Sequence, residues 1–345
     1  MRKIGFLSLI TVLVFSTFLI TETAVSQTES EDPDSRLLSL VKHDVFSVSG
    51  LLQAYGRFSF EDNNFNGGRT FQAGNARLTF SGNLDQDFDY QFQFNFAREP
   101  NLLDAYIGYN YSERFRIRAG AQKPIISAEF IPNPGLTDFI SRARLVGTYF
   151  KPREIGVSFY GDIDQFYYNV GMYNGTGVTT NVDNRFFYTT RLAYNMELQG
   201  DDNLRIGGNF AFGESFGTTS GTTNIQLAGN RYIYGADVRY ENDTWIFAAE
   251  VLAGDLEVTN YIAGPEEQII SYYITGGYKL NEQTQILARW DHLGFQERDR
   301  RNNQFILGFT HYATDLISFK INLISQFDEV ADNQMGLSTS LQFQF

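Results

Sequence analysis

The sequence contains no cysteine. A disulfide framework and a lipid anchor on an N-terminal cysteine are therefore excluded. Methionine and tryptophan are scarce, with 4 and 2 residues, whereas phenylalanine and tyrosine number 32 and 20. Beyond the N-terminal stretch, no segment approaches the run of about 20 apolar residues that a membrane-spanning helix requires. These absences exclude a helical membrane protein and leave an unusual abundance of aromatic rings for another kind of structure.

Positive charge is also in deficit. The chain has 27 Lys and Arg against 40 Asp and Glu, a formal net charge of −13. From residue 27 onwards the charge is −14, because residues 1–26 contain two basic side chains and one acidic one. Proteins that bind nucleic acid neutralise phosphates with an excess of Lys and Arg. No nucleic acid partner is therefore expected.

The one long apolar run lies at the start of the chain. Arg2 and Lys3 precede an apolar segment over residues 4–20, and Ala24 and Ser26 place small residues before a cleavage point at Gln27. This pattern predicts a secretory signal peptide over residues 1–26, and an uncleaved membrane anchor is the alternative. Residues 27–44 are polar and acidic, which is typical of a short disordered lead-in on the periplasmic side.

The dominant pattern in the rest of the chain has a period of two. From residue 88 to 96 every second residue is Phe or Tyr, and the residues between them are Asp, Gln, Gln and Asn. In a strand these two sets point to opposite faces. We predict sixteen strands, at 46–61, 69–84, 87–98, 101–111, 114–123, 153–163, 165–173, 185–195, 203–213, 231–241, 243–254, 268–279, 283–293, 303–312, 315–327 and 334–345.

Connections between these segments alternate in length. Short connections such as 85–86, 112–113 and 281–282 alternate with long ones such as 124–152, 214–230 and 255–267. Bacterial outer-membrane barrels have an even number of strands, short periplasmic turns and longer extracellular loops. A sheet in hydrocarbon must also close on itself, and sixteen strands leave a water-filled lumen. The sequence therefore predicts an all-β fold, a 16-stranded antiparallel transmembrane barrel over residues 45–345.

The C-terminus carries a further signal. Apolar residues alternate back from Phe345 through Phe343, Leu341 and Leu337. This ending resembles the last strand that outer-membrane barrel assembly machinery recognises. The alternative is an ordinary edge strand that ends in Phe.

Arginines follow one face of the segment 114–123. If its apolar residues face lipid, Arg114, Arg116 and Arg118 form a lumen-facing row with a spacing of roughly 7 Å. Such a row can pass an anion from site to site. The alternative is that acids pair with these arginines in a purely structural role. Further candidate lumen arginines are Arg77, Arg191, Arg205, Arg239 and Arg289, and we expect Asp237 and Asp291 to neutralise the last two.

The predicted register tests the structural alternative. A three-residue turn at 111–113 places Asn110 opposite Arg114, Gly108 opposite Arg116 and Tyr106 opposite Arg118. Paired residues face the same side of the sheet. The preceding strand then offers the row a single carboxylate, Asp104, and the following strand offers Glu154. Both roles stay open.

The longest connection, 124–152, is rich in apolar residues. Structureless loops of this length are usually functional or disordered, and this composition is not that of a disordered segment. We expect the loop to fold into the barrel and narrow it, with Arg142, Arg144 and Lys151 bringing positive charge that Glu129 and Asp138 oppose. The alternative is a loop packed over the mouth or against a neighbouring subunit.

Enzymatic signals are weak. The predicted hairpin pairs His292 with Asn303, so His292 and His311 lie roughly 27 Å apart and cannot share a metal ion or a proton relay. The G-x-S-x-G and H-E-x-x-H motifs are missing from the sequence, and the spacing of acidic residues near Glu61 is not distinctive. We expect no catalytic residue, no metal and no cofactor. A transporter with 22 strands and a plug domain would need a longer chain.

Five segments resemble the phosphate-selective porin O and P family: 75–82 (NARLTFSG), 103–109 (LDAYIGY), 116–124 (RIRAGAQKP), 153–157 (REIGV) and 171–175 (GMYNG). The resemblance implies a 16-stranded barrel that forms a homotrimer, with an anion-leaning channel and a constricting third loop. Arg116, Arg118 and Lys123 match the family pattern at the start of that loop.

These observations favour an outer-membrane porin, embedded in outer-membrane lipid, through which small polar solutes diffuse passively. We expect a preference for anions, with phosphate among them. The alternative is a non-conducting structural or adhesin barrel.

Overall fold

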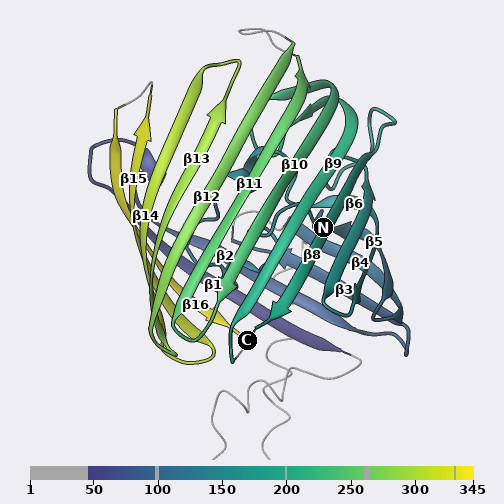
Figure 1. Ribbon diagram of the computed structural model, residues 1–345, viewed down its shortest axis with the longest axis horizontal. Coiled ribbons are helices and arrows are strands. Elements are labelled where there is room, and N and C mark those ends of the chain that lie inside the picture. The colour runs from purple at the N-terminus through teal and green to yellow at the C-terminus, as the bar shows by residue number, and fades with distance from the viewer. Residues whose placement is uncertain (1–45, 98–100, 199, 260–264, 330–331) are drawn as a thin grey trace, which may run out of the picture. The chain divides into compact units, whose positions relative to one another are not determined.

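The computed structural model describes residues 46–97, 101–198, 200–259, 265–329 and 332–345. The predicted signal peptide and the whole of the predicted lead-in lie outside these residues. All sixteen predicted strands are present, and each is antiparallel to its neighbours in the sequence. The first strand pairs with the last, so the sheet is a closed barrel (Figure 1). The predicted fold class is confirmed.

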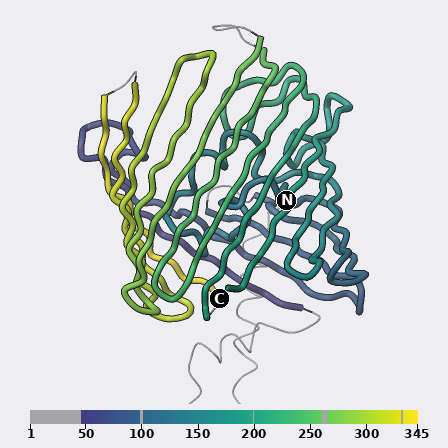
Figure 2. The backbone as a smooth tube through the Cα atoms, viewed as in Figure 1, coloured from purple at the N-terminus to yellow at the C-terminus, as the bar shows by residue number. Residues whose placement is uncertain are grey.

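The strands are β1 (Ser47–Ser59), β2 (Arg69–Asn83), β3 (Phe88–Asn95), β4 (Asn101–Ser112), β5 (Phe115–Gln122), β6 (Glu154–Ile163), β7 (Phe166–Tyr173), β8 (Phe187–Glu197), β9 (Asn203–Thr219), β10 (Gln226–Glu241), β11 (Trp245–Val258), β12 (Glu266–Asn281), β13 (Thr284–Phe295), β14 (Arg300–Tyr312), β15 (Ile317–Asp328) and β16 (Gln334–Gln344). The strands run obliquely around the wall (Figure 2).

Among the residues that the structure describes, helical structure is confined to three short pieces, η1 (Phe65–Gly67), η2 (Pro134–Leu136) and α3 (Leu145–Thr148). Within the described part of the chain, no helix is long and apolar enough to cross a membrane.

The burial of side chains is the reverse of that in a water-soluble protein. Large apolar side chains on the outer face are exposed, such as Phe210 at 45% and Phe247 at 50%. Charged side chains on the inner face are buried, such as Arg191 at 1% and Glu250 at 2%. A chain that exposes its apolar face in this way is stable only where hydrocarbon surrounds it. Many of the aromatic residues that the composition left unexplained lie on this outer face.

Several strands are longer than predicted. Much of 214–230 and of 255–267, expected to be loops, belongs instead to β9, β10, β11 and β12, and β13 and β14 leave only 296–299 between them. Figure 1 shows these green strands rising above their neighbours. In these added lengths of strand the pattern of apolar and polar residues is reversed. Leu227 and Leu256 face inward and are buried, whereas Asn230 and Glu257 face outward. Strands that rise out of hydrocarbon no longer need an apolar outer face, and this inversion concealed them in the sequence.

The middle of the outer wall provides a first test of the membrane orientation. Leu307 lies near the centre of β14 and is 42% exposed. We expect Leu307→Lys to lower the free energy of unfolding in lipid by about 2–4 kcal/mol, because a charge at the bilayer midplane is poorly solvated. The same substitution at the outward, polar Gln226, the first residue of β10, is expected to cost less than about 1 kcal/mol. Urea unfolding in vesicles would measure both, and equal costs would contradict the placement of the membrane.

Candidate functional site

The segment 123–153, which we call the inner loop, lies inside the barrel. It bonds to inward-facing residues of strands on several sides of the wall, which is possible only if it crosses the lumen. The Glu250 carboxylate on β11 accepts the backbone N–H groups of Ala128 and Glu129, each at 3.0 Å. On β15, the Asn322 side chain accepts the N–H of Ile140 at 2.8 Å. These bonds satisfy backbone donors that would otherwise be buried without partners.

Ion pairs hold the inner loop to the wall as well. Arg289 on β13 pairs with Glu129 at 2.9 Å, and Arg239 on β10 pairs with Asp138 at 2.9 Å. We expected Asp237 and Asp291 to neutralise these two arginines, and that assignment was wrong. Asp237 pairs with Arg191 at 2.6 Å, and Asp291 accepts Arg144 Nε at 3.2 Å. Arg239 also pairs with Glu241, two residues further along β10, at 2.8 Å, so its acids are Asp138 and Glu241 rather than Asp237.

The middle of the inner loop is hydrogen-bonded to the wall at the seam between β1 and β16, where the first and last strands pair. Gln53 of β1 and Gln342 of β16 hydrogen-bond to each other at 2.7 Å. Their amide groups also donate to the carbonyls of Pro134 and Gly135, at 3.3 and 3.2 Å. The Lys320 ammonium on β15 donates to the Thr137 carbonyl.

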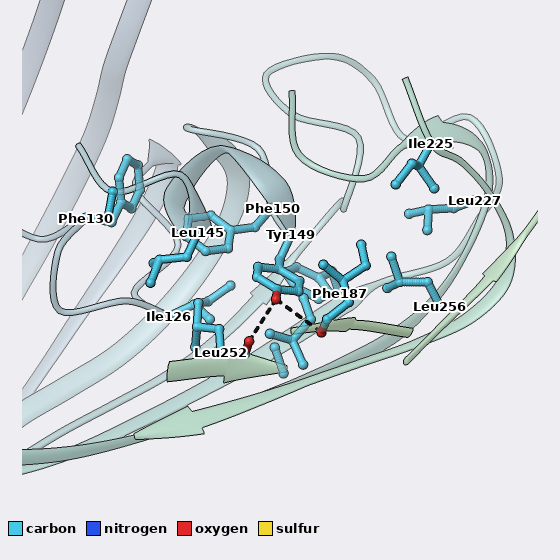
Figure 3. Close-up of a cluster of buried hydrophobic side chains, with 14 of the residues drawn as sticks. Ile126, Phe130, Leu145, Tyr149, Phe150, Phe187, Ile225, Leu227, Leu252 and Leu256 are labelled. Carbon is cyan, nitrogen blue, oxygen red and sulfur yellow. Dashed lines mark hydrogen bonds between the residues drawn. The ribbon is translucent and has the colours of Figure 1, made fainter. Parts of the chain in front are cut away.

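The end of the inner loop forms a hydrophobic core inside the barrel. Leu145, Tyr149 and Phe150 pack against inward-facing Phe187 and Leu252 of the wall (Figure 3). The Tyr149 hydroxyl donates to the Leu252 carbonyl at 2.8 Å and lies 2.7 Å from Ser271 Oγ. The inner face of β8 to β13 is thus covered by the loop, and the inner face of β2 to β7 is not part of this core.

The predicted register of β4 and β5 was wrong by two residues. Gly108 faces Arg118 and Asn110 faces Arg116, because Ser112 pairs directly with Phe115 across a bulge. Arg114 consequently lies in the turn rather than in the inward row. Its side chain is 71% exposed and is 3.9 Å from Asp164.

The other two arginines of the row do face inward, with different partners. Arg116 pairs with Asp162 at 3.5 Å. Arg118 donates to the Tyr160 hydroxyl at 3.1 Å, and in the described part of the barrel no carboxylate pairs with it. The expected acids are occupied elsewhere: Asp104 pairs with Arg153 at 2.5 Å, and Glu154 accepts the N–H groups of Gly175 and Gly177, each at 3.0 Å.

Three more predicted cations lie toward the same side of the lumen. Arg77 donates to Asn75 at 2.9 Å. Lys123 donates to the carbonyls of Phe130, Ile131 and Pro132 at 3.2, 3.0 and 3.2 Å. Arg142 donates to the carbonyls of Glu129 and Pro132. Among the residues that the structure describes, none of the three forms an ion pair with a carboxylate, so their charges are not cancelled locally.

Arg144 differs from these residues. It donates to Asp291 through its backbone N–H and its side chain, and to Asn302 on β14. Its role is therefore to anchor the loop.

Lys123 lies just beyond β5 and is crowded by positive charge. Burial, followed by the neighbouring Arg153 and Arg142, lowers its pKa to about 6. The charge of Lys123 is then present below pH 6 and is lost as the pH rises through that value.

This titration leads to a pH-dependent expectation. Between pH 5 and pH 8 the chloride-to-potassium permeability ratio should fall in the wild type, because one positive charge of the lumen disappears. In Lys123→Met the ratio should stay low and change less over the same range. Reversal potentials in a KCl gradient would measure this. A wild-type ratio that does not change with pH would show that the three carbonyl acceptors keep the ammonium charged.

Two cavities lie below the inner loop, on the side of the short turns. One has a volume of about 650 Å³ and is lined by Arg205, Arg239, Lys279 and Glu241, among others. The second, of about 280 Å³, shares Arg205 and Arg239 and extends to Glu129 and Asp138 of the loop. Sequence reasoning placed Arg205 in the lumen but gave it no role. The alternation of residues along its strand was the only signal for Arg205, and it indicates that the side chain faces inward but not that it lines a cavity.

The histidines lie apart, as their register predicted. His292 faces Asn303 and His311 faces Thr284 on the β13–β14 hairpin. Within the described residues, no group of three or more His, Cys, Asp or Glu side chains is arranged to hold a metal ion.

A family model for phosphate-selective porin O and P matches residues 49–345, most of the chain. The chain belongs to this porin family. Its membership agrees with the geometry, because a closed barrel with an apolar exterior and a polar lumen is a passage through a membrane. No curated protein matches the sequence.

Solved porins share the fold of this porin at low sequence identity. The trimer form of OmpT from Vibrio cholerae superposes with a TM-score of 0.66 and 14% identity, over 88% of this chain and 100% of that one. An anion-selective porin from Comamonas acidovorans gives 0.64 and 10%, over 87% and 99%. OmpF from Salmonella typhi, in complex with daunomycin, gives 0.64 and 11%, over 87% and 97%. Family and fold together show an outer-membrane diffusion channel.

Proposed function

We propose that this porin is an anion-leaning channel for small polar solutes and that inorganic phosphate is one of them. The observation that carries this proposal is the uneven pairing of charge in the lumen. Arg77, Arg118 and Arg142 have no carboxylate partner among the described residues, nor does Lys123, which adds its charge below about pH 6, whereas Arg144, Arg191, Arg239 and Arg289 are each paired with an acid. The net charge of the whole chain does not set this preference, because a passing ion responds to the local potential.

The route that we propose runs between the inner loop and the wall of β2 to β7. The loop core fills the opposite side, where Phe187, Leu252 and Tyr149 are fully buried. On the proposed route the inward side chains of Arg77, Arg116, Arg118 and Tyr160 are half-buried, so solutes can reach them. The inner loop is thus the constriction of the channel, and an ion that passes it meets the unpaired cations.

Assembly and export complete the proposal. The family and the trimer form of the Vibrio cholerae neighbour support a homotrimer. Residues 1–26 would direct export, and the short turns would lie in the periplasm. Phe345 directly follows the last strand, makes a tilted ring contact with Phe343 at a centroid distance of 5.6 Å and exchanges backbone hydrogen bonds with Gly50. We propose that the assembly machinery recognises this end before the barrel closes.

Recording from planar bilayers tests the function. In a KCl gradient, we expect a reversal potential closer to the equilibrium potential of chloride than to that of potassium. In symmetrical potassium phosphate, we expect a measurable single-channel current. A potassium-leaning potential would overturn the anion preference. Folded protein that migrates as a heat-modifiable band yet leaves the bilayer sealed would favour the structural or adhesin barrel.

A further inference from the structure

Arg118 is enclosed by two tyrosine rings. Its guanidinium carbon lies 4.2 Å from the ring centroid of Tyr106 and 5.0 Å from that of Tyr160. The register explains this arrangement. Tyr106 of β4 faces Gly120, two residues beyond Arg118, and Tyr160 of β6 faces Arg116, two residues before it. The rings therefore approach from the two neighbouring strands and from opposite directions along β5.

The enclosure controls which part of the guanidinium can bind a solute. Aromatic faces stabilise a cation that lies over them and exclude water from its flat sides. One terminal nitrogen donates to the Tyr160 hydroxyl at 3.1 Å. The Nε atom is buried and has no acceptor in the described part of the protein. The terminal N–H groups that do not bond to Tyr160 thus remain as the place where a carboxylate could bind.

The neighbouring acids do not pair with the positive charge of Arg118. On β3 the Asp89 carboxylate accepts the amide of Asn110 from β4 at 2.7 Å and lies over the inward-facing Gly108. On β6 Asp162 pairs with Arg116 at 3.5 Å. Neither acid is within ion-pair distance of Arg118 among the described contacts. The wall around Arg118 therefore combines one unneutralised cation with two aromatic rings.

We propose that Arg118, Tyr106 and Tyr160 form a binding site for aromatic carboxylates on the permeation route. This inference rests on the proposed function as an anion-leaning channel and names a class of anion that the channel would prefer. The carboxylate takes the guanidinium edge, and the flat apolar ring of the solute lies against the tyrosines. An acetate ion has the carboxylate that contacts the guanidinium but no ring to lie against the tyrosines. The site therefore ranks benzoate above acetate, although size alone would favour the smaller ion.

Block of the chloride current distinguishes the two ions. Benzoate or acetate is added on one side of a bilayer that holds the full-length porin in KCl, and the half-blocking concentration is measured for each. The wild type is expected to be half-blocked by benzoate at a concentration about fivefold lower than by acetate, as one aromatic contact would give. In the double variant Tyr106→Leu with Tyr160→Leu, the two concentrations are expected to become equal.

Two control variants separate the rings from other effects. The pair Tyr106→Phe with Tyr160→Phe keeps the rings and should keep the preference for benzoate. Tyr167→Leu removes an inward tyrosine of β7 that makes no ring contact with Arg118 among the described residues, and it should also keep the preference. Heat-modifiable migration checks that every variant is folded.

The outcomes are separable. An anion-leaning wild type with equal half-blocking concentrations, or a preference that survives in the leucine pair, would overturn the aromatic site and leave the channel function standing. A potassium-leaning wild type would overturn the proposed function itself.

Discussion

Removing the inner loop is expected to raise the single-channel conductance about two- to fivefold, toward that of an open barrel of this strand number. The loop enters the lumen between neighbouring strands: Gln122 at the end of β5 faces Glu154 at the start of β6. A short Gly-Ser linker in place of residues 126–149 can therefore close the hairpin without disturbing the wall. The passage would then be limited by the barrel rather than by the loop.

The same deletion should lower stability. It leaves inward-facing Phe187, Leu227 and Leu252, all fully buried under the loop, in contact with water. The hydrophobic effect that now holds the loop in place would be lost. We expect the temperature at which the heat-modifiable band disappears to fall, and the variant should still fold because strand pairing is intact.

A matched variant tests the anchors without shortening the chain. Glu250→Gln with Arg289→Met removes one carboxylate that accepts two backbone N–H groups and one arginine that pairs with Glu129. The expected result is a noisier open state with a mean conductance that rises less than about twofold, because the apolar end of the loop still holds. An unchanged conductance after deletion of the loop would contradict its role as the constriction.

The second large effect is expected in ion selectivity. Arg118→Ala removes a positive charge that has no carboxylate partner, and Arg116→Ala leaves Asp162 unpaired with 46% of its side chain exposed. Both changes make the local potential more negative. The double variant should lower the chloride-to-potassium permeability ratio about tenfold, which corresponds to a loss of about 1.4 kcal/mol of attraction for the anion.

Arg114 provides the control for this series. It belongs to the same sequence row but lies in the turn, with 71% of its side chain exposed. Charges in free contact with salt water are screened within about 10 Å at 0.1 M. Arg114→Ala should therefore shift the reversal potential far less than Arg118→Ala. Equal shifts in both, or none in the double variant, would remove the row from selectivity.

Prediction from the sequence succeeded where the surroundings of a single strand, lipid on one face and the lumen on the other, decide its pattern of residues. Hydrocarbon outside and polar groups inside demand the alternation seen at residues 88–96, and β3 forms there. Where a strand leaves the bilayer this demand ends, and the added lengths of β9 to β12 were missed. The register of β4 and β5 failed because a bulge at the hairpin shifts every pair by two residues without changing which residues face inward.

The candidate site shows the same division. That Arg116, Arg118 and Arg77 face the lumen followed from alternation and the direction of lipid. Which of them keep an unneutralised charge did not, because it depends on how the acids are shared: Asp104, expected near the row, pairs with Arg153 of the inner loop, and Arg116 finds Asp162 on β6.

The sequence by itself determined a 16-stranded closed wall, its two faces and most of the cations on its inner face, because these depend on a period of two and on hydrocarbon. Only the tertiary structure decided the path of the inner loop, the partners of the arginines and the enclosure of Arg118 by two tyrosines. Those features depend on contacts between residues far apart in the chain. Their distances are set by closure of the barrel and by packing against it, and no local pattern encodes them.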